Sequence, residues 1–270
     1  MTLYTVIGAR GFIGAHLVER LHAEGVEVYA PDRGDESLLD RDLGRVFYCA
    51  GLTGDYRSRP FDAVEAHVAL LARLLERGRF ERLVYLSSTR LYGESAHAEE
   101  HLPLTLNPND PEHLYELSKA LGESLVLHRS GGRGRVARLS YVFDWTPEAT
   151  GFLSDWLAFA RTGRDISLAG HPDGARDYIH RDDAVAALRA ILDGQAPGLF
   201  NVASGRLTSN AELAQVFTRA GWRTTFASGE GPVRPPAPPA IARLSALGVQ
   251  PRDVRELVAE VLAGLTPPPT

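Results

Sequence analysis

The sequence is poor in cysteine, in excess positive charge and in long apolar runs. Its one cysteine, Cys49, excludes an internal disulfide and suits a reducing cytoplasm, and no Cys/His spacing indicates a metal site. The formal net charge of −5 argues against a nucleic-acid partner or an anionic membrane surface. No stretch is apolar enough to span a membrane and no signal peptide is recognisable. We therefore expect a cytoplasmic protein without a membrane partner.

Lysine is nearly absent as well. Lysine and arginine together number 29, yet Lys119 is the only lysine. Because the chain is so strongly biased toward arginine, this single lysine indicates a position whose function arginine, with its different geometry, cannot perform.

Strand-like and helix-like segments alternate along much of the chain. The strand-like runs are Leu3–Ile7, Val26–Ala30, Arg45–Ala50, Arg82–Ser87, Arg135–Leu139 and Leu199–Val202, and the helix-like segments are Phe12–His22, Phe61–Arg77, His113–His128 and Asp182–Leu192. This alternation predicts an α/β fold, a doubly wound and Rossmann-like parallel sheet with helices on both faces. Only about a dozen residues separate Asp32 from Val46, too few for a further helix, strand and helix. We therefore expect one edge of the sheet to be trimmed.

The pattern loosens in two places, where glycine, proline and short elements dominate. We predict a dinucleotide-binding domain made of residues 1–145 and 176–203. A smaller C-terminal substrate lobe would comprise residues 146–175 and 204–265. The last residues, 266–270, read TPPPT and are expected to form a disordered tail.

A glycine-rich loop, GARGFIG, follows the first strand-like run. Gly8, Gly11 and Gly14 are spaced for a tight turn, a close backbone approach to a pyrophosphate, and close packing of the next helix on the strand. The free N–H groups at the helix start would bind the phosphates. The alternative is an ordinary turn between strand and helix. The position of the loop, before a second strand that ends in an acid, favours dinucleotide binding.

That acid is Asp32, at the end of VEVYAPD. A carboxylate there can accept hydrogen bonds from both hydroxyls of an adenosine ribose and repels a 2′-phosphate, which favours NAD. Arg10 and Arg33 could instead pair with the 2′-phosphate of NADP, or be ordinary surface arginines. We predict NAD as the cofactor, with NADP as the alternative.

Tyr115 and Lys119 are four residues apart on a predicted helix and therefore share one of its faces. An ammonium near a phenol lowers the pKa of the phenol, so the tyrosine can exchange a proton with a carbinol or carbonyl oxygen. A serine from the run SSTRLYG can hydrogen-bond the same oxygen while hydride moves between that carbon and a nicotinamide. The compact ammonium can also donate to ribose hydroxyls, which explains why this residue is lysine. The alternative is a chance pair on a helix surface.

These motifs resemble an extended short-chain dehydrogenase/reductase of the nucleotide-sugar epimerase/dehydratase group, over nearly the whole chain. The segments that carry the resemblance are GARGFIG, VFYCAG, LVYLSSTRLYG, YELSK, DGARDYIHRDDAVAALRAIL, LFNVASG and VRPP. The implied catalytic residues are Ser88, Tyr115 and Lys119. The expected cofactor contacts are Gly8, Arg10, Gly11, Phe12, Ile13, Gly14, Asp32, Arg33, Ala50, Ser87, Tyr115 and Lys119. The implied substrate contacts are Ser88, Thr89, Tyr141, Arg176 and Arg234, of which the two arginines would hold a sugar-nucleotide diphosphate.

The chain departs from the family pattern on the substrate side. His67 stands where the family often has an asparagine, and we interpret it as a histidine on a helix face rather than a replacement polar contact. Tyr141 stands where an asparagine often contacts substrate phosphate. Thr89 and Arg90 replace the Asp-Glu pair with which the sugar 4,6-dehydratases of this family remove water. Because arginine does not deprotonate, this replacement argues against dehydration.

We predict an NAD(P)-dependent epimerase that acts on a nucleotide-activated sugar through a transient keto intermediate. The alternatives are an NAD(P)H-dependent keto-sugar reductase and a catalytically silent dinucleotide-binding protein. The resemblance also implies a homodimer, in which the helices Phe61–Arg77 and His113–His128 pair with those of a second copy.

Overall fold

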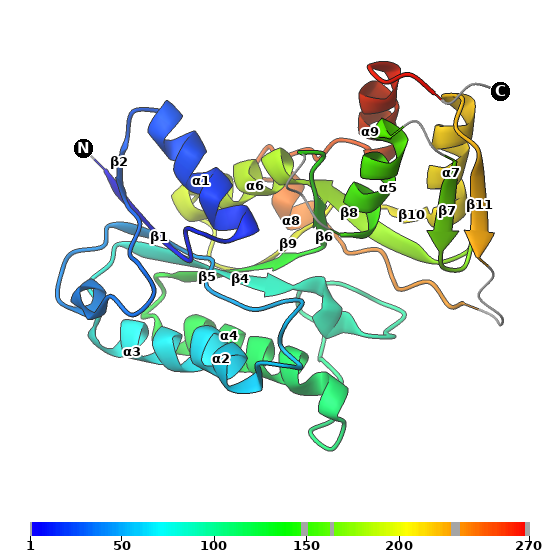
Figure 1. Cartoon of the computed structure of the whole chain (residues 1–270). Helices are drawn as coiled ribbons and strands as arrows, with labels where there is room; N and C mark the ends of the chain where they lie inside the picture. The colour runs from blue at the N-terminus through cyan, green and yellow to red at the C-terminus, as the bar shows by residue number, and fades with distance from the viewer. Residues whose placement is uncertain (1, 147–150, 163–164, 228–232, 268–270) are drawn as a thin grey trace.

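The computed structural model describes residues 2–146, 151–162, 165–227 and 233–267 (Figure 1). At its centre is a six-stranded parallel sheet with the order β2-β1-β3-β4-β5-β9. The strands are β1 (Leu3–Ile7), β2 (Glu27–Tyr29), β3 (Arg45–Tyr48), β4 (Arg82–Ser88), β5 (Gly134–Leu139) and β9 (Gly198–Val202). The predicted Rossmann-like class is confirmed. The strand order reverses between β1 and β3, and ligands of such sheets bind at the carboxyl ends of the strands beside that reversal.

Helices cover both faces of this sheet (Figure 1). On one face lie α1 (Phe12–Ala23) and α6 (Arg181–Asp193), and on the other α2 (Pro60–Val64), α3 (Leu70–Arg77) and α4 (Leu114–Arg129). A π-helical turn, η2 (Glu65–Ala69), joins α2 to α3. Leu17 and Leu21 of α1 are one turn apart and pack with Phe47 of β3 in the same buried cluster. The i, i+4 spacing thus turns an apolar stripe of the helix onto the sheet.

The trimmed edge that the sequence predicts is confirmed in the described part of the chain. β2 has three residues and is the outer strand of the sheet. Only a 3₁₀ turn, η1 (Glu36–Leu39), lies between β2 and β3. Leu38 and Leu39 of this turn are buried against Leu71 and Leu74 of α3 in one apolar cluster. The turn therefore covers apolar surface that a further strand and helix would otherwise cover.

A second group of elements surrounds its own apolar core. The strands β6 (Tyr141–Phe143), β7 (Ile166–Ala169), β8 (Ala175–His180), β10 (Leu207–Ser209) and β11 (Thr224–Ala227) and the helices α5 (Phe152–Arg161), α7 (Asn210–Arg219) and α9 (Val254–Ala263) form this part. Trp156, Phe217 and Trp222 fill its core. α7 begins with a capping box between Ser209 and Glu212, the clearest sequence signal among these short elements.

The predicted domain boundaries remain a proposal. Tyr178 of β8 packs in the core of the second group, whereas Leu244 of the short helix α8 (Ala242–Ser245) packs in the core of the main sheet. Chain segments therefore cross between the two cores on both sides of the predicted division. In the predicted tail, residues 266 and 267 have no helix or strand, and residues 268–270 lie outside the described residues.

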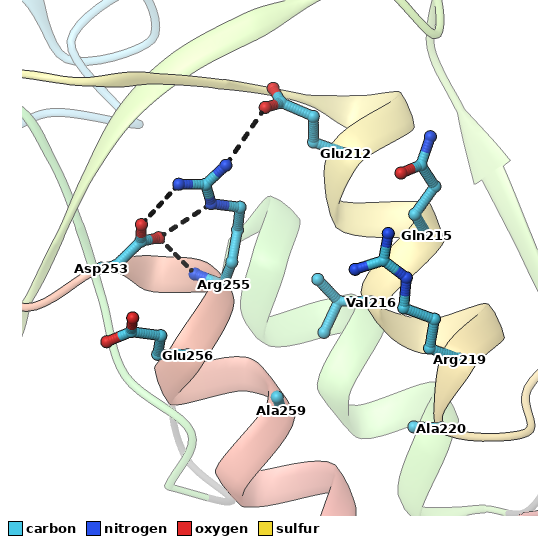
Figure 2. A pocket seen from close by; sticks show the side chains of 9 residues that line it. All are labelled: Glu212, Gln215, Val216, Arg219, Ala220, Asp253, Arg255, Glu256 and Ala259. Carbon is cyan, nitrogen blue, oxygen red and sulfur yellow. Dashed lines mark hydrogen bonds and ion pairs between the residues drawn. The ribbon is translucent and has the colours of Figure 1, made fainter.

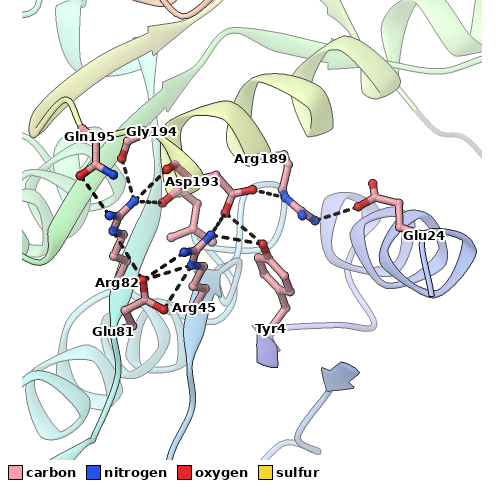
Figure 3. Close-up of polar contacts among 10 residues, drawn as sticks. Tyr4, Glu24, Arg45, Glu81, Arg82, Arg189, Asp193, Gly194 and Gln195 are labelled. Carbon is pink, nitrogen blue, oxygen red and sulfur yellow. Dashed lines mark hydrogen bonds and ion pairs between the residues drawn. The ribbon is translucent and has the colours of Figure 1, made fainter. Parts of the chain in front are cut away.

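Charged side chains tie the elements together at the amino ends of the strands (Figure 3). Asp193, the last residue of α6, accepts hydrogen bonds at Oδ1 from Nη1 of Arg45 at 2.8 Å and from the Tyr4 hydroxyl at 3.0 Å. Its backbone carbonyl accepts one from Nη1 of Arg82, also at 2.8 Å. This network lies at the end of the sheet opposite to the glycine-rich loop and Ser88, so we assign it a structural role.

Candidate active site

The glycine-rich loop is shaped by close backbone approaches. Gly8 has a positive φ of 89°, and a Cβ built on it would lie 2.6 Å from the backbone nitrogen of Ala50. A Cβ on Gly14 would lie 2.2 Å from the carbonyl oxygen of Gly8. Either side chain would displace backbone. The two glycines thus let the start of α1 lie directly against the ends of β1 and β3.

The start of α1 is open to an anion. Gly11 is the N-cap residue, and no side chain in the described part of the chain accepts a hydrogen bond from the first N–H groups of the helix. Ile13 packs against the main core, while the Phe12 ring is 40% exposed. Free N–H groups and the positive end of the helix dipole suit a phosphate. The loop therefore suits the pyrophosphate of a dinucleotide, to which Phe12 and Ile13 could donate, whereas the N–H of the predicted contact Gly11 already donates to the Gly8 carbonyl at 3.0 Å.

The predicted adenosine side of the site is an exposed rim. Arg10 forms an ion pair with Asp32, and both side chains are at least three-quarters exposed. Arg33, which is 70% exposed, pairs with Asp62 of α2 at 3.0 Å. The Asp32 carboxylate thus has Arg10 as its cationic partner. Arg33 is the next residue in the segment that follows β2. Because the sheet ends at β2, no further strand covers this rim in the described part of the chain.

Tyr115 and Lys119 lie together in the interior, on one face of α4, with 3% and 5% of their surfaces exposed. Nζ of Lys119 donates a hydrogen bond to the carbonyl of Leu86 at 2.8 Å, and burial lowers the pKa of Lys119 to about 7. Burial raises the pKa of Tyr115, while the Ser88 and Thr53 hydroxyls lower it in part. The predicted triad of Ser88, Tyr115 and Lys119 is therefore brought together.

Three hydroxyl residues lie at the carboxyl end of β4. Oγ of Ser88 accepts a hydrogen bond from the N–H of Arg90 at 3.2 Å, at the start of the 3₁₀ turn η3 (Thr89–Tyr92). Oγ1 of Thr89 donates to the carbonyl of Leu139 at 3.3 Å. Oγ of Ser87 is buried and has no hydrogen-bond partner among the described residues. Ser88 can thus still donate its proton toward Tyr115 or a substrate oxygen, and Ser87 can still bind a ligand.

The interpretation of His67 as merely a histidine on a helix face, rather than a polar contact, is wrong. The side chain is fully buried on the π-helical turn η2. Its Nε2 accepts a hydrogen bond from the N–H of Leu52 at 3.1 Å, which places the ring proton on Nδ1, 2.8 Å from Oγ of Ser118. Burial and, secondarily, the charge of Lys119 lower the pKa of His67 to about 3. His67 is therefore neutral and holds the segment after β3 against α4. π-helical turns often occur at functional sites.

Arg90 also lies closer to the chemistry than its sequence position indicates. Its Cζ is 4.6 Å from the centroid of the Tyr115 ring and 5.5 Å from that of Tyr56. Its Nη2 forms an ion pair with Oε1 of Glu116 at 2.7 Å. A cation is thus in direct contact with the predicted acid–base, at a position that the sequence singled out only for lacking a dehydratase carboxylate.

On the predicted substrate side, Tyr141 and Arg176 lie beside each other. The Tyr141 hydroxyl accepts a hydrogen bond from the N–H of Phe152 at 2.7 Å. The guanidinium of Arg176 is 4.5 Å from the Phe152 ring and 6.0 Å from the Tyr141 ring. Arg234 is exposed in a segment without helix or strand. Within the described residues neither Arg176 nor Arg234 forms an ion pair with a carboxylate, so both charges are free to bind an anion.

Two surface cavities among the described residues lie elsewhere. One, of about 540 Å³, is a groove between α7 and α9 lined by residues such as Gln215, Arg219 and Glu256 (Figure 2). The other, of about 620 Å³, lies at the amino ends of the strands near Thr2 and Phe80. No predicted site residue lines either cavity. The described residues contain no cluster of potential metal ligands and no helix long and apolar enough to cross a membrane.

A family model supports the same class of protein. The chain belongs to the NAD dependent epimerase/dehydratase family, whose model matches residues 4–203. This confirms the resemblance, and with it an NAD(P)-dependent enzyme of the extended short-chain dehydrogenase/reductase type.

Individual relatives are distant. The chain is 27% identical over 259 residues to a dTDP-4-dehydro-6-deoxy-D-allose reductase of Streptomyces bikiniensis, a match that covers 78% of each chain. It is 29% identical over 238 residues to a GDP-6-deoxy-D-mannose reductase of Pseudomonas aeruginosa, covering 78% of this chain and 77% of the relative. Among solved structures, MoeE5 in complex with UDP-glucose and NAD has a TM-score of 0.78 at 24% identity, covering 97% of this chain and 98% of that one. This last likeness concerns the fold.

Proposed function

We propose that this chain is an NAD(P)H-dependent reductase that converts a keto group of a nucleotide-activated sugar to a hydroxyl. The observation that favours a reductase over an epimerase is the exposed rim formed by Arg10, Asp32 and Arg33. A reductase must release oxidised cofactor in every cycle, and a rim without a covering strand gives a dinucleotide fewer contacts to hold it. The sequence favours an epimerase. The exposed rim, together with the reductases among the relatives, moves the proposal to its first alternative.

The buried triad accounts for the proton in this reaction. Tyr115 would donate its hydroxyl proton to the keto oxygen, and Ser88 would donate a hydrogen bond to the same oxygen. Lys119 would hold the cofactor ribose and favour the phenolate that remains. When bound, the nicotinamide supplies the hydride for the carbonyl carbon. Thr89 and Arg90 carry no carboxylate for the removal of water, so the site favours reduction over dehydration.

The remaining predicted contacts divide between cofactor and substrate. The loop residues Gly8, Gly11, Phe12, Ile13 and Gly14 with Ala50 and Ser87 would line the dinucleotide. We retain NAD over NADP because the Asp32 carboxylate lies in the segment just after β2, although Arg10 already offsets its charge. Arg176 and Arg234 would bind the two phosphates of the nucleotide sugar, with Tyr141 and Thr89 beside the sugar.

The test is turnover of a panel of UDP-, dTDP- and GDP-linked keto sugars with NADH or NADPH. Absorbance of the reduced cofactor and NMR of the sugar would be followed in parallel, with Tyr115→Phe as the control. The expected result is one equivalent of reduced cofactor consumed for each hydroxyl formed. Tight dinucleotide binding with no conversion of any keto or hydroxy sugar would contradict the reductase and favour the catalytically silent dinucleotide-binding protein.

Epimerisation is the second candidate, favoured by the carboxylate at Asp32. NAD that stays bound between turnovers suits an enzyme that returns its hydride to the same sugar. In that reaction Tyr115 would first accept the hydroxyl proton and later give it back. Conversion of a hydroxy sugar to its epimer with NAD, and without net NADH, would decide for this candidate.

We also infer a homodimer and a cytoplasmic location. Phe61 of α2 is 87% exposed, and Leu121 and Leu127 of α4 are exposed as well, at 51% and 36%. Large apolar side chains on neighbouring helices suit an interface with a second copy. Light scattering of the wild type and of Leu121→Glu would test this, with a monomer expected only for the variant. Secretion into an oxidising compartment would contradict the location inferred from the single cysteine.

A further inference from the structure

We propose that Arg90 is a second cation of the acid–base centre, which positions Tyr115 and stabilises its phenolate from the side opposite to the buried interior. The proposal rests on the proposed function in that Tyr115 is taken as the proton carrier. It concerns a residue to which neither the sequence pattern nor the family resemblance gives a role.

The placement of Arg90 is fixed at three points. Its backbone N–H donates to Oγ of Ser88 at 3.2 Å, its guanidinium pairs with Oε1 of Glu116 at 2.7 Å, and its Cζ lies 4.6 Å from the Tyr115 ring. The Tyr56 ring completes the enclosure, 5.4 Å from that of Tyr115. One residue thus touches both hydroxyl residues of the predicted triad and the side chain that follows the tyrosine.

Arg90 is the nearer of the two cations to Tyr115. Nζ of Lys119 is 6.0 Å from the Tyr115 ring centroid, compared with 4.6 Å for Cζ of Arg90. Burial lowers the pKa of Lys119 to about 7, so near neutral pH its charge is partly lost. Arginine keeps its charge throughout. Before a cofactor binds, Arg90 is therefore the permanent positive charge at the phenol.

Glu116 opposes this effect without cancelling it. Burial raises the pKa of Tyr115 most, the hydroxyls of Ser88 and Thr53 lower it, Arg90 lowers it further, and Glu116 raises it by a smaller amount. The charged and titratable groups that face Tyr115 are Tyr56, His67, Tyr85, Arg90, Glu116 and Lys119. His67 is neutral in this range. Removing the charge of Arg90 should therefore raise the pKa of Tyr115, and removing the charge of Glu116 should lower it.

The ion pair also explains why Arg90 can lie against the ring. With 43% of its side chain exposed, the guanidinium keeps contact with solvent, while the Glu116 side chain is only 9% exposed. A carboxylate so buried is stable beside a cation and costly without one. Glu116 therefore holds the arginine over the ring, and a glutamine at this position, whose amide oxygen can accept the same hydrogen bond, would keep it there without the negative charge.

The experiment is a ¹⁹F NMR titration of the free protein labelled with 3-fluorotyrosine, in which fluorine brings the phenol ionisation to a lower pH. The Tyr115 signal is assigned from its absence in Tyr115→Phe. In Arg90→Gln the midpoint of Tyr115 ionisation should rise by about one pH unit, and in Glu116→Gln it should fall. Arg90→Lys should lie between the wild type and Arg90→Gln.

Arg57→Gln is the matched control, because Arg57 stacks on Tyr56 at 5.1 Å and pairs with Glu112 but does not touch Tyr115. Its midpoint should equal that of the wild type. An unchanged midpoint in Arg90→Gln, or shifts of the same sign in Arg90→Gln and Glu116→Gln, overturns the proposal. The titration needs no substrate and therefore tests the role of Arg90 independently of the proposed reductase activity. The shifts can be found in a protein that reduces no keto sugar, and a reductase can be found whose Tyr115 midpoint does not respond to Arg90→Gln.

Discussion

Replacing Lys119 by arginine or by methionine tests whether burial governs the charge of the only lysine. The side chain is 5% exposed, and Nζ has a hydrogen bond to the Leu86 carbonyl but no ion pair with any carboxylate in the described residues. A Cβ on Gly51 would lie 3.2 Å from Nζ, so the amine is closely enclosed by backbone. An ammonium in such a place has lost most of its hydration, and the charge of Glu123 offsets this loss only in part.

The sign of the pH dependence follows from the two protonation states. The pKa of Lys119 is lowered from 10.5 to about 7 in the folded chain. Between these values the unfolded chain binds the proton and the folded chain does not, so the free energy of unfolding rises with pH, by about 1.4 kcal/mol per unit. Over the whole interval the gain is roughly 5 kcal/mol. Lys119→Arg keeps its proton in both states and Lys119→Met has none to bind, so both variants lack this gain.

The assay is urea unfolding of the three proteins without cofactor from pH 6 to pH 10. The stability of the wild type should increase relative to both variants as pH rises above 7. Overpacking by the larger guanidinium adds a cost of about 1–3 kcal/mol in Lys119→Arg, but this cost does not vary with pH. A difference between wild type and Lys119→Met that stays constant across the range would refute the reasoning.

Three further predictions concern other parts of the site. Tyr115→Phe should lower turnover roughly a hundred-fold or more while calorimetry still detects dinucleotide binding, and persistent activity would remove Tyr115 as the acid–base. Asp32→Asn should shift the ratio of dissociation constants toward NADP, because it frees Arg10 from its ion pair. A wild type that already prefers NADP by tenfold, about 1.4 kcal/mol, would contradict the role given to Asp32. His67→Leu should lower the free energy of unfolding by about 1–3 kcal/mol, because it leaves the N–H of Leu52 without its partner and removes the hydrogen bond to Ser118, whose hydroxyl still donates to the Tyr115 carbonyl. His67→Gln should restore part of this loss, and a leucine variant as stable as the wild type would argue against it.

The fold was predictable where local pattern and tertiary structure agree. The runs Leu3–Ile7 and Arg82–Ser88 are apolar because helices cover both faces of the parallel strands, and such runs are visible in the sequence. The glycines of the loop were predictable for a similar reason, since Gly8 and Gly14 leave no room for a side chain. The strands β7 and β11 were not predictable. Each has four residues, too few to show a strand-like alternation of apolar and polar residues, and they pair with one another across a long stretch of the chain.

The candidate site was predictable as far as its residues are linked by spacing along one element. Tyr115 and Lys119 share a helix face, so their proximity follows from the sequence. His67 and Arg90 come from other elements, and their contacts with α4 depend on a π-helical turn and on the path of the chain after β4. Neither feature leaves a periodic signal, and the burial of His67 could therefore not be inferred from its neighbours in the chain.

The enclosure of Lys119 explains why this position is lysine and not arginine better than its place in the sequence does. Geometry alone would make arginine a poor fit for ribose hydroxyls, yet long side chains often adjust. This site, where no described carboxylate pairs with Nζ, favours a group that can release its proton when no ligand compensates the charge. Lysine meets this condition with a pKa near 7, and arginine does not. Arg90, with Glu116 beside it and solvent around it, shows the reverse case, in which arginine is tolerated next to the same tyrosine. The single lysine therefore stands where a cation is enclosed by backbone beside the predicted acid–base, although Arg135, equally buried and without an ion pair among the described residues, shows that burial alone does not exclude arginine.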